Sequence, residues 1–171
     1  PIAVMLLLAW SMSDILGLLG ADAYVANWVA GSISAEHLPL LIFLVACLVS
    51  FTTGSSWGTF ALLFPLALPA AVSVEASLAL SIAAVLSGGL FGDHASPISE
   101  TTLLASAGAG VEPIDHFKTQ LPYALCNGGL CVVGLWLAAV SQWRGVVIVV
   151  LGLQVGVILI AKKLWHREVA S

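Results

Sequence analysis

The chain has 171 residues and a formal net charge of −4; 60% of the residues are hydrophobic, only 8% are charged, and the mean hydropathy is +1.09. Soluble domains average roughly 25% charged and roughly 45–50% apolar residues, so this composition excludes a water-soluble globule, a disordered tail and a nucleic-acid-binding protein. Lipid is the expected solvent, and at about 20 apolar residues per crossing the length allows roughly five or six crossings.

The chain opens at Pro1 inside an apolar run, without an initiator Met or a basic region. This start is not that of a signal peptide, and we expect an internal start and therefore a fragment. The first apolar region, residues 2–19, contains one charge, Asp14, and residues 21–30 form a short amphipathic continuation.

The second apolar region, residues 38–72, would be about 52 Å long as one helix, which is too long for a single crossing. The sequence TTGSSWG within it contains small hydroxyl residues and glycines, which favour unwound backbone. We therefore predict a helix break there, with Pro65 and Pro69 bending the segment that follows.

A third span, residues 76–90, ends in a second polar, Gly-rich interruption, SGGLFGDHASPISETT. A short apolar piece over residues 103–111, a polar loop EPIDHFKTQ, and two complete spans over residues 121–140 and 146–161 follow. The sequence thus predicts an all-α membrane protein, a polytopic helical bundle with two broken or re-entrant segments.

The two breaks are the candidate functional segments. Irregular backbone at membrane depth is tolerated only where it is buried in protein or lines an aqueous cavity, and unwound segments of transporters coordinate ions. Their hydroxyls are the oxygen donors that a hard cation such as Na+ uses. The alternative is that these hydroxyls only cap helix ends.

Carboxylates distinguish a functional site from a structural role better than hydroxyls do, because an acid at the centre of a membrane helix costs roughly 2.5–3.5 kcal/mol. Asp14, Asp93 and Glu100 are the intramembrane candidates. A carboxylate in a partly desolvated cavity holds either a proton or a cation, which is the minimal mechanism of cation/proton exchange. His94 is a further candidate, whose alternative role is a neutral imidazole bound to a backbone carbonyl. The three cysteines lie in apolar runs without a CxxC pair, so neither a zinc site nor a disulfide framework is expected. No cofactor is expected.

At these residues the sequence resembles a known family. FGDHASPISETTLLASAGAG, with DHFKTQLPYAL downstream and TTGSSWGTFALLFP upstream, is similar to the C-terminal part of the NhaC-type Na+/H+ antiporters, which carry GDH-SPIS-D/E-TT and G-S/T-SWGT signatures. The opening AWSMSDILGLLGADAYV is similar to the preceding helix of that family. The resemblance implies secondary active transport of Na+ against H+ in a fold of two inverted repeats with discontinuous helices.

The resemblance carries roles to individual positions. Together with the carboxylate argument for Asp14, it gives as ion- or proton-binding residues Asp14, Asp93, His94, Ser96, Ser99, Glu100, Thr101, Ser55, Ser56 and Thr59. It gives as structural motif residues Gly54, Trp57, Gly58, Gly92 and Pro97. Asp93 and Glu100 are the expected Na+ ligands. Family members often have Asp where this chain has Glu100, which leaves ion selectivity open.

Family members are also much longer, so residues 1–171 are expected to be the C-terminal repeat of a cation/proton antiporter in a prokaryotic cell membrane. Its expected partners are the lipid bilayer and either the N-terminal half of the same transporter or a second copy, with Na+ and H+ as cargo.

Three other functions compete with this one. Coupled exchange of a small organic acid is the nearest, but no intramembrane Lys or Arg is available to neutralise an organic anion. An intramembrane hydrolase would use Ser55 or Ser56 as nucleophile and His94 as base. An inert partner subunit or truncated remnant is the third.

Overall fold

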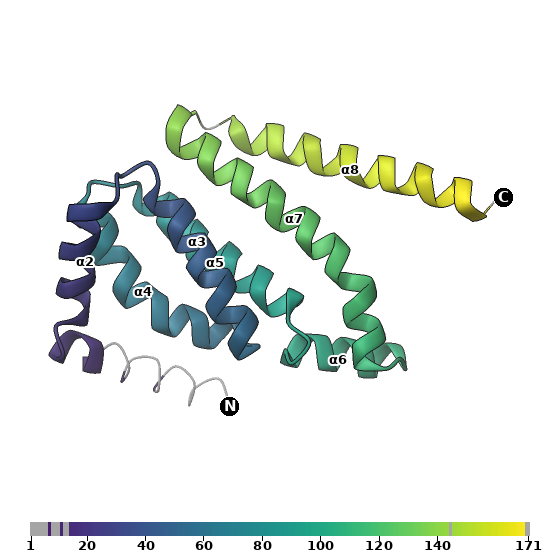
Figure 1. Cartoon of the computed structure of the whole chain (residues 1–171), viewed down its shortest axis with the longest axis horizontal. Helices are drawn as coiled ribbons and strands as arrows, with labels where there is room; N and C mark the ends of the chain where they lie inside the picture. Colours follow the sequence, from purple (N-terminus) through teal and green to yellow (C-terminus); the bar gives the residue numbers. More distant parts are fainter. Residues whose placement is uncertain (1–6, 8–10, 12–13, 144, 170–171) are drawn as a thin grey trace.

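The computed structural model describes residues 7, 11, 14–143 and 145–169, with side chains up to residue 159. The described chain is all helical: α2 (Ala21–Ser32), α3 (Leu38–Thr53), α4 (Ser56–Ser73), α5 (Leu78–Ala95), α6 (Glu100–Ala109), α7 (Pro113–Ser141) and α8 (Val146–Val169) (Figure 1). The predicted fold class is thus confirmed as all-α within these residues.

Three of the described helices, α4, α5 and α7, are long and apolar enough to cross a membrane. Helix α3 and residues Val146–Leu159 of α8 are shorter apolar helices. The described residues thus contain fewer complete crossings than the five or six that the chain length allows.

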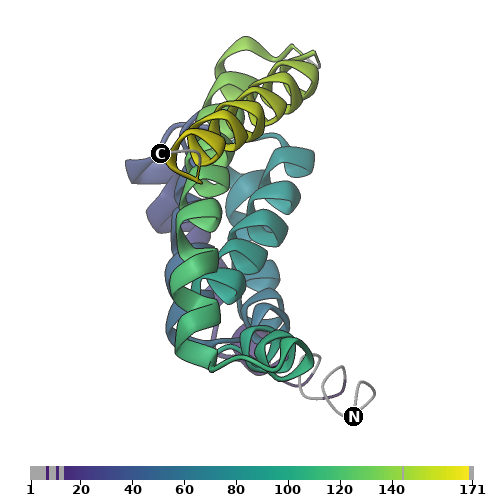
Figure 2. The same cartoon turned by 90° about the vertical axis from the view of Figure 1, so that its right-hand side faces the viewer.

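Helix α5 is the centre of the fold. It contacts α3, α4, α6 and α7, while α2 packs on α4 and α8 packs on α7. Helices α3, α4, α5 and α7 run up and down the bundle, and α6 lies across one end of it in both views (Figures 1 and 2). Helices α7 and α8 are consecutive and in contact.

Helices α3 and α5 run in the same direction because α4 returns the chain between them (Figure 1). Their backbones touch at two glycines: a Cβ on Gly88 would lie 2.5 Å from the carbonyl oxygen of Phe43, and one on Gly92 would lie 2.5 Å from that of Cys47. The Ser50 hydroxyl donates to the Gly89 carbonyl across the same contact, at 2.5 Å. Small residues four apart are the usual means of bringing membrane helices this close.

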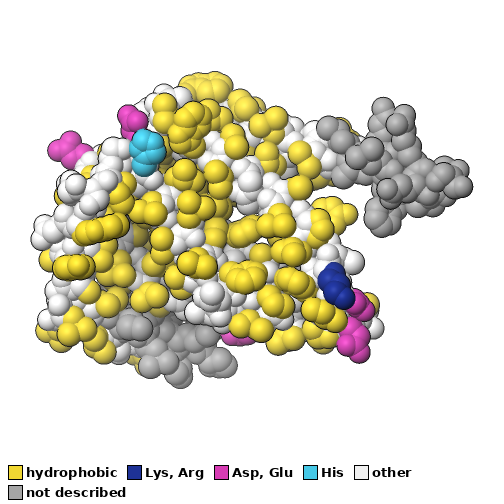
Figure 3. Space-filling view, viewed as in Figure 1, with side chains coloured by type: hydrophobic (Ala, Val, Ile, Leu, Met, Phe, Trp, Pro, Cys, Tyr) yellow, Lys and Arg dark blue, Asp and Glu magenta, His cyan; other side chains and the backbone are white. Residues whose placement is uncertain are grey.

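The face drawn in Figure 3 is largely apolar between two charged ends. Glu36 and Glu75 are exposed and line one small pocket at the end where α2 joins α3 and α4 joins α5. Asp115 and Lys118 are exposed near the start of α7, at the other end. Large hydrophobic side chains are exposed along the helices between these ends, which is the distribution expected of helices surrounded by lipid.

The first predicted break is confirmed, since α3 ends at Thr53 and α4 begins at Ser56. Pro65 and Pro69 lie inside the continuous helix α4. The second break is shorter than predicted, because helix α5 continues to Ala95 and only residues 96–99 separate it from α6. The glycines that suggested unwinding instead pack against neighbours: Gly88 and Gly92 face α3, and Gly89 faces Phe60 of α4.

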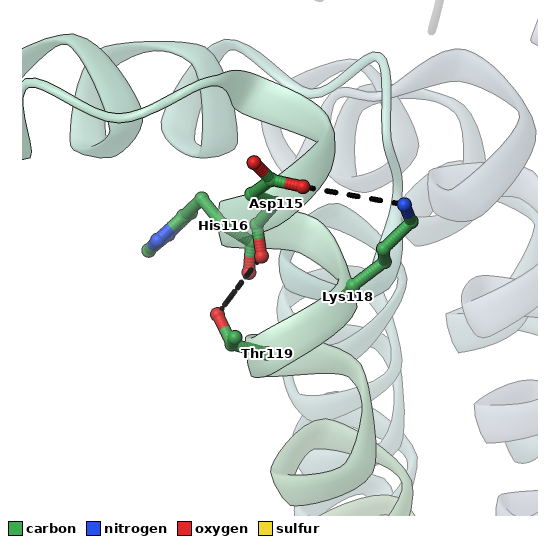
Figure 4. Close-up of polar contacts among 4 residues, drawn as sticks. All are labelled: Asp115, His116, Lys118 and Thr119. Atoms are coloured by element: carbon green, nitrogen blue, oxygen red, sulfur yellow. Dashed lines mark hydrogen bonds and ion pairs between the residues drawn. The ribbon is translucent and has the colours of Figure 1, made fainter.

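The polar segment before the fourth span is also helical rather than a loop. Helix α7 begins at Pro113, with proline at its first position and Asp115 in its first turn, two features that favour a helix N-terminus. Within these turns Asp115 pairs with Lys118 at 4.0 Å and Thr119 donates to backbone carbonyls one turn earlier (Figure 4). The polar residues are accommodated because these turns lie at an end of the bundle.

Candidate functional site

The two helix breaks lie against each other. Gly54 ends α3 in the left-handed conformation, with φ of 67°, and a Cβ at this position would lie 2.9 Å from the carbonyl oxygen of Ile98. The contact follows from the parallel course of α3 and α5, whose touching residues are offset by 39 to 45 positions. Helices that run in parallel and end at equivalent positions bring their breaks to one place.

Hydroxyls of the first break stabilise the start of α4. Ser55 has an extended backbone, and its side chain accepts a hydrogen bond from the Gly58 amide at 3.2 Å. The Thr59 hydroxyl donates to the Ser55 carbonyl at 2.9 Å. Ser56 and Thr59 are buried. These contacts match the capping role that was the alternative interpretation for this segment.

The second break contains a buried carboxylate. Asp93 lies in the last turn of α5 and is 3% exposed. The Ser99 hydroxyl donates to Asp93 Oδ1 at 2.5 Å. The same Ser99 oxygen caps α6 by accepting from the Thr101 and Thr102 amides at 3.1 and 3.4 Å. Ser99 therefore joins the carboxylate to the first turn of the next helix.

The connection between α5 and α6 is held by further hydrogen bonds. The Ser96 amide donates to the Asp93 carbonyl, and the Thr102 hydroxyl donates to the Ser96 carbonyl, both at 3.2 Å. Five polar residues here are buried and form what we call the polar cluster: Asp93, Ser96, Ser99, Thr102 and Ser106. The cluster supplies oxygen atoms only.

The charge of Asp93 is not balanced by a basic side chain among the described residues. The ion pair among the described residues lies elsewhere, at the start of α7, where it joins Asp115 and Lys118, whose side chains are both 67% exposed (Figure 4). Burial of a carboxylate is strongly unfavourable unless a positive partner compensates it. Among the described residues, the hydrogen-bond donor to its carboxylate is the Ser99 hydroxyl.

The other charged candidates are placed differently. His94 and Glu100 are exposed, and His94 Nδ1 lies 2.8 Å from the Leu90 carbonyl oxygen, which is the backbone contact of its alternative role. Asp14 is exposed in the helical turns that lead into α2, and α2 packs on α4 rather than on α5 or α6. Of the four, only Asp93 is buried.

The remaining predicted positions divide between packing and surface. Gly92 and Gly54 are contact positions between chain segments, and Gly58 lies within α4's first turn. Trp57 is exposed and lies edge-on to Phe60. Of the remaining predicted positions, Pro97 in the second break and Thr101 in the first turn of α6 are exposed, with the Thr101 hydroxyl 2.7 Å from that of Ser99.

The sequence interpretation missed Gln120, which it placed in a loop. Gln120 lies in α7, and its Oε1 atom is buried without a hydrogen-bond partner. Ala124 and Gly128, four and eight residues further on, are among the buried residues of the same helix. This spacing of four is the signal that would have identified the residue as part of a buried helical face.

The donor set fits a hard monovalent cation. Carboxylate, hydroxyl and carbonyl oxygens are the ligands of such ions, and these are what the polar cluster contains. Within the described part of the chain, no group of three or more His, Cys, Asp or Glu side chains is arranged to hold a metal. A single carboxylate among neutral oxygens balances one positive charge.

Gly54→Ala is expected to disturb the contact between the breaks. Alanine would have to adopt the left-handed backbone conformation of this position, and its Cβ would lie 2.9 Å from the Ile98 carbonyl oxygen. Gly110→Ala is the matched control, because Gly110 ends α6 with the same φ of 67° but has nothing within 4 Å. We expect Gly54→Ala to lower the thermal unfolding temperature in detergent more than Gly110→Ala; equal losses would mean that only backbone strain matters.

The chain is similar in sequence to known proteins. A family model described as the Na+/H+ antiporter family matches residues 1–140. An uncharacterised protein of Haemophilus influenzae is 40% identical over 120 residues, covering 70% of this chain and 23% of the relative. An uncharacterised Na+/H+ antiporter of the same organism is 31% identical over 142 residues, covering 74% of this chain and 30% of that protein.

The malate-2H+/Na+-lactate antiporter of Bacillus subtilis is 32% identical over 122 residues, covering 64% of this chain and 26% of the relative. The chain thus spans between about a quarter and a third of the length of these relatives. No solved structure shows a significant match.

Proposed function

Because the chain belongs to the Na+/H+ antiporter family, we propose that it forms part of a secondary transporter that exchanges Na+ for H+ across a membrane. The family membership confirms the resemblance noted in the sequence, and it implies an integral membrane protein, in agreement with the three apolar helices of spanning length. The chemistry of exchange is assigned to the second helix break.

The observation that carries the proposal is the burial of Asp93 without a basic partner among the described side chains. A carboxylate that is 3% exposed is stable only with a proton or a cation beside it. The two occupants exclude each other because each neutralises the same charge. Binding H+ on one side of the membrane and Na+ on the other makes Asp93 the exchanging group.

The surrounding residues favour Na+ as the cation. Ser99 donates its hydrogen to Asp93 Oδ1, while Ser96, Thr101 and Thr102 provide further oxygens within the same connection. Glu100 lies at the exposed start of α6, where a carboxylate is favoured by the helix dipole and can attract cations toward the break. In this proposal Asp93 and Glu100 serve the cation in different ways, the first as ligand and the second as an entrance charge.

Exchange of a small organic acid is the second candidate. The Bacillus subtilis relative is named as an antiporter of malate and lactate. In this chain, the N-termini of α4 and α6 lie at the two breaks, and helix N-termini favour carboxylates. Against it, Lys118 is exposed on α7, and no other Lys or Arg side chain falls among those described. The cation-only exchange therefore remains the preferred proposal.

A hydrolase is not supported by the geometry. In the described chain, no hydrogen bond joins His94 to Ser55 or Ser56: the imidazole contacts the Leu90 carbonyl, and Ser55 caps α4. A nucleophile needs its base within hydrogen-bond reach. Family membership likewise indicates a transporter rather than an enzyme.

The proposed working unit includes more protein than this chain, since the relatives are about three times as long. Either the other half of the same transporter or a second copy would cover the exposed side of the breaks, in the membrane of a prokaryotic cell. No cofactor enters the proposal, because the cargo ions themselves carry the charge.

Everted membrane vesicles test this function. Vesicles that contain the protein as its gene encodes it should respond to added Na+ with collapse of a preformed pH gradient, and vesicles without it should not. Choline at the same concentration controls for ionic strength. A pH gradient that collapses only when malate or lactate is also present would replace the cation exchanger by the organic-acid exchanger.

A further inference from the structure

Two hydroxyl groups connect the buried carboxylate to the exposed start of α6. The Ser99 hydroxyl oxygen lies 2.5 Å from Asp93 Oδ1 and 2.7 Å from the Thr101 hydroxyl oxygen. Both distances are within the range of O–H···O hydrogen bonds. The contacts of the same Ser99 oxygen with the amides of α6 are longer, at 3.1 and 3.4 Å. The two shortest contacts of Ser99 therefore join Asp93 to Thr101.

Exposure rises along this chain of side chains. Asp93 is 3% exposed and Ser99 is fully buried, whereas Thr101 is exposed. Thr101 follows Glu100, an exposed carboxylate whose charge would be costly in hydrocarbon. Helix α6 also contacts α7, whose first turns carry the exposed ion pair (Figure 4). The first turn of α6 is therefore expected to meet water, and Thr101 is the hydroxyl that can exchange a proton with it.

Two arrangements of hydrogens fit the same oxygen positions, because a hydroxyl donates one hydrogen and accepts others. Ser99 donates to Asp93 Oδ1, and in the contact between Ser99 and Thr101 either oxygen can be the donor. With Asp93 ionised, the Thr101 hydrogen points to Ser99 and the Ser99 hydrogen points to Asp93. With Asp93 protonated on Oδ1, both hydrogen bonds reverse. Passage between the two arrangements moves one proton along the chain.

Other ionisable side chains near Asp93 show no such connection. His94 is its neighbour in α5, but adjacent residues of a helix do not face each other, and His94 Nδ1 contacts the Leu90 carbonyl. In the described chain, no hydrogen bond joins Glu100 to Asp93. Helices α3 and α4 contain no Asp, Glu, His, Lys or Arg, and those of α7 lie in its first two turns. The hydroxyl chain is therefore the route that the geometry favours.

We propose that Ser99 and Thr101 form a relay that carries protons between Asp93 and water at the start of α6. The inference rests on the proposed function and adds a route for the proton to it. When Na+ displaces the proton, the Asp93 O–H bond breaks and its hydrogen binds Ser99 Oγ. The Ser99 hydrogen passes to Thr101 Oγ1, and the Thr101 hydrogen passes to a water molecule. Each hydroxyl loses one O–H bond and gains one, and proton uptake follows the reverse order.

The test uses Thr101→Val, which keeps the branched shape of the side chain and removes its hydroxyl, and Thr101→Ser, which keeps a hydroxyl. Thr119→Val is the matched control, because Thr119 is exposed in α7 and its hydroxyl donates to backbone carbonyls. All are made in the protein as its gene encodes it. Proton release from the purified protein in detergent is followed by stopped flow with a pH-sensitive dye after addition of saturating Na+, so that a change in Na+ affinity does not affect the rate.

We expect Thr101→Val to release protons about tenfold more slowly than the wild type. This is less than the roughly hundredfold or more for loss of a positioned proton-transfer group, because water can partly replace an exposed hydroxyl. The number of protons released and the unfolding temperature should stay close to those of the wild type. Thr101→Ser and Thr119→Val should release protons at the wild-type rate. A wild-type rate in Thr101→Val, or equal slowing in Thr101→Ser or Thr119→Val, would overturn the inference.

Failure of the proposed function is recognised separately, in the unsubstituted protein. A wild type that releases no protons on addition of Na+ and shows no Na+-dependent proton flux in vesicles overturns the exchanger, and the relay with it. A wild type that exchanges Na+ for H+ while Thr101→Val releases protons equally fast overturns only the relay.

Discussion

Asp93→Asn is expected to abolish Na+-dependent proton exchange without weakening the fold. Asparagine has the shape of aspartate and can still bond Ser99, which donates to Oδ1 in the structure. Its amide neither takes up a proton nor neutralises a cation, so the exchange rate should fall roughly a hundredfold or more, as for loss of a proton-transfer group. In the absence of Na+ the unfolding temperature should stay close to that of the wild type, because the side chain keeps its shape and the hydrogen bond from Ser99.

Asp115→Asn provides the matched control. Asp115 is exposed at the start of α7 and contacts only Lys118 at 4.0 Å among the ion pairs described (Figure 4). An exposed pair of this kind contributes little to stability. We expect wild-type exchange in vesicles containing this variant. Normal exchange by Asp93→Asn would remove Asp93 from the mechanism, and a fall in its unfolding temperature would assign it a structural role instead.

Gly92→Ala is expected to have the largest effect on stability. The added Cβ would lie 2.5 Å from the Cys47 carbonyl oxygen, 2.6 Å from Ser50 Cβ and 2.7 Å from the Phe51 amide nitrogen. Two of these are backbone atoms that cannot turn aside, so α3 and α5 must separate. Overpacking of this kind costs about 1–3 kcal/mol, measured by thermal unfolding in detergent.

Gly129→Ala separates this steric effect from the general effect of adding a methyl group to a helix. Gly129 lies inside α7 and has nothing within 4 Å of a Cβ. Alanine has the better helix propensity, so this variant should be as stable as the wild type or slightly more stable. Equal stability of the Gly92 and Gly129 variants would contradict the close contact of α3 and α5. Separation of these helices should also impair exchange, because Asp93 follows Gly92 directly.

The sequence was sufficient to locate the breaks and the buried acid. Thr52 to Gly58 interrupts a segment too long for one helix, and the helices do end there. Pro97 and the hydroxyls beside it mark the second connection, where proline and capping serines stop one helix and begin another. The sequence identifies Asp93 as a candidate because burying a carboxylate in an apolar membrane segment costs free energy, whatever its neighbours.

The extent of the second break could not be predicted, because glycine has two meanings in a membrane segment. It favours unwound backbone in isolation, but spaced four apart, as at Gly88 and Gly92, it permits close helix packing, and only the neighbouring helix decides between the two. The same dependence on neighbours separates the buried Asp93 from the exposed Asp14 and Glu100. Gln120 was missed because polar residues at a helix end resemble a loop.

The contact between Gly54 and Ile98 makes the lengths of two distant segments depend on each other. Adding one residue to α3 between Phe43 and Gly54 would advance its end by about 1.5 Å and rotate it by about 100°, so the breaks would no longer meet. Compensation requires a matching insertion in α5 between Gly88 and Ile98. The connection from α4 to α5 is under no such constraint, and insertions and deletions should therefore accumulate there rather than within the paired helices.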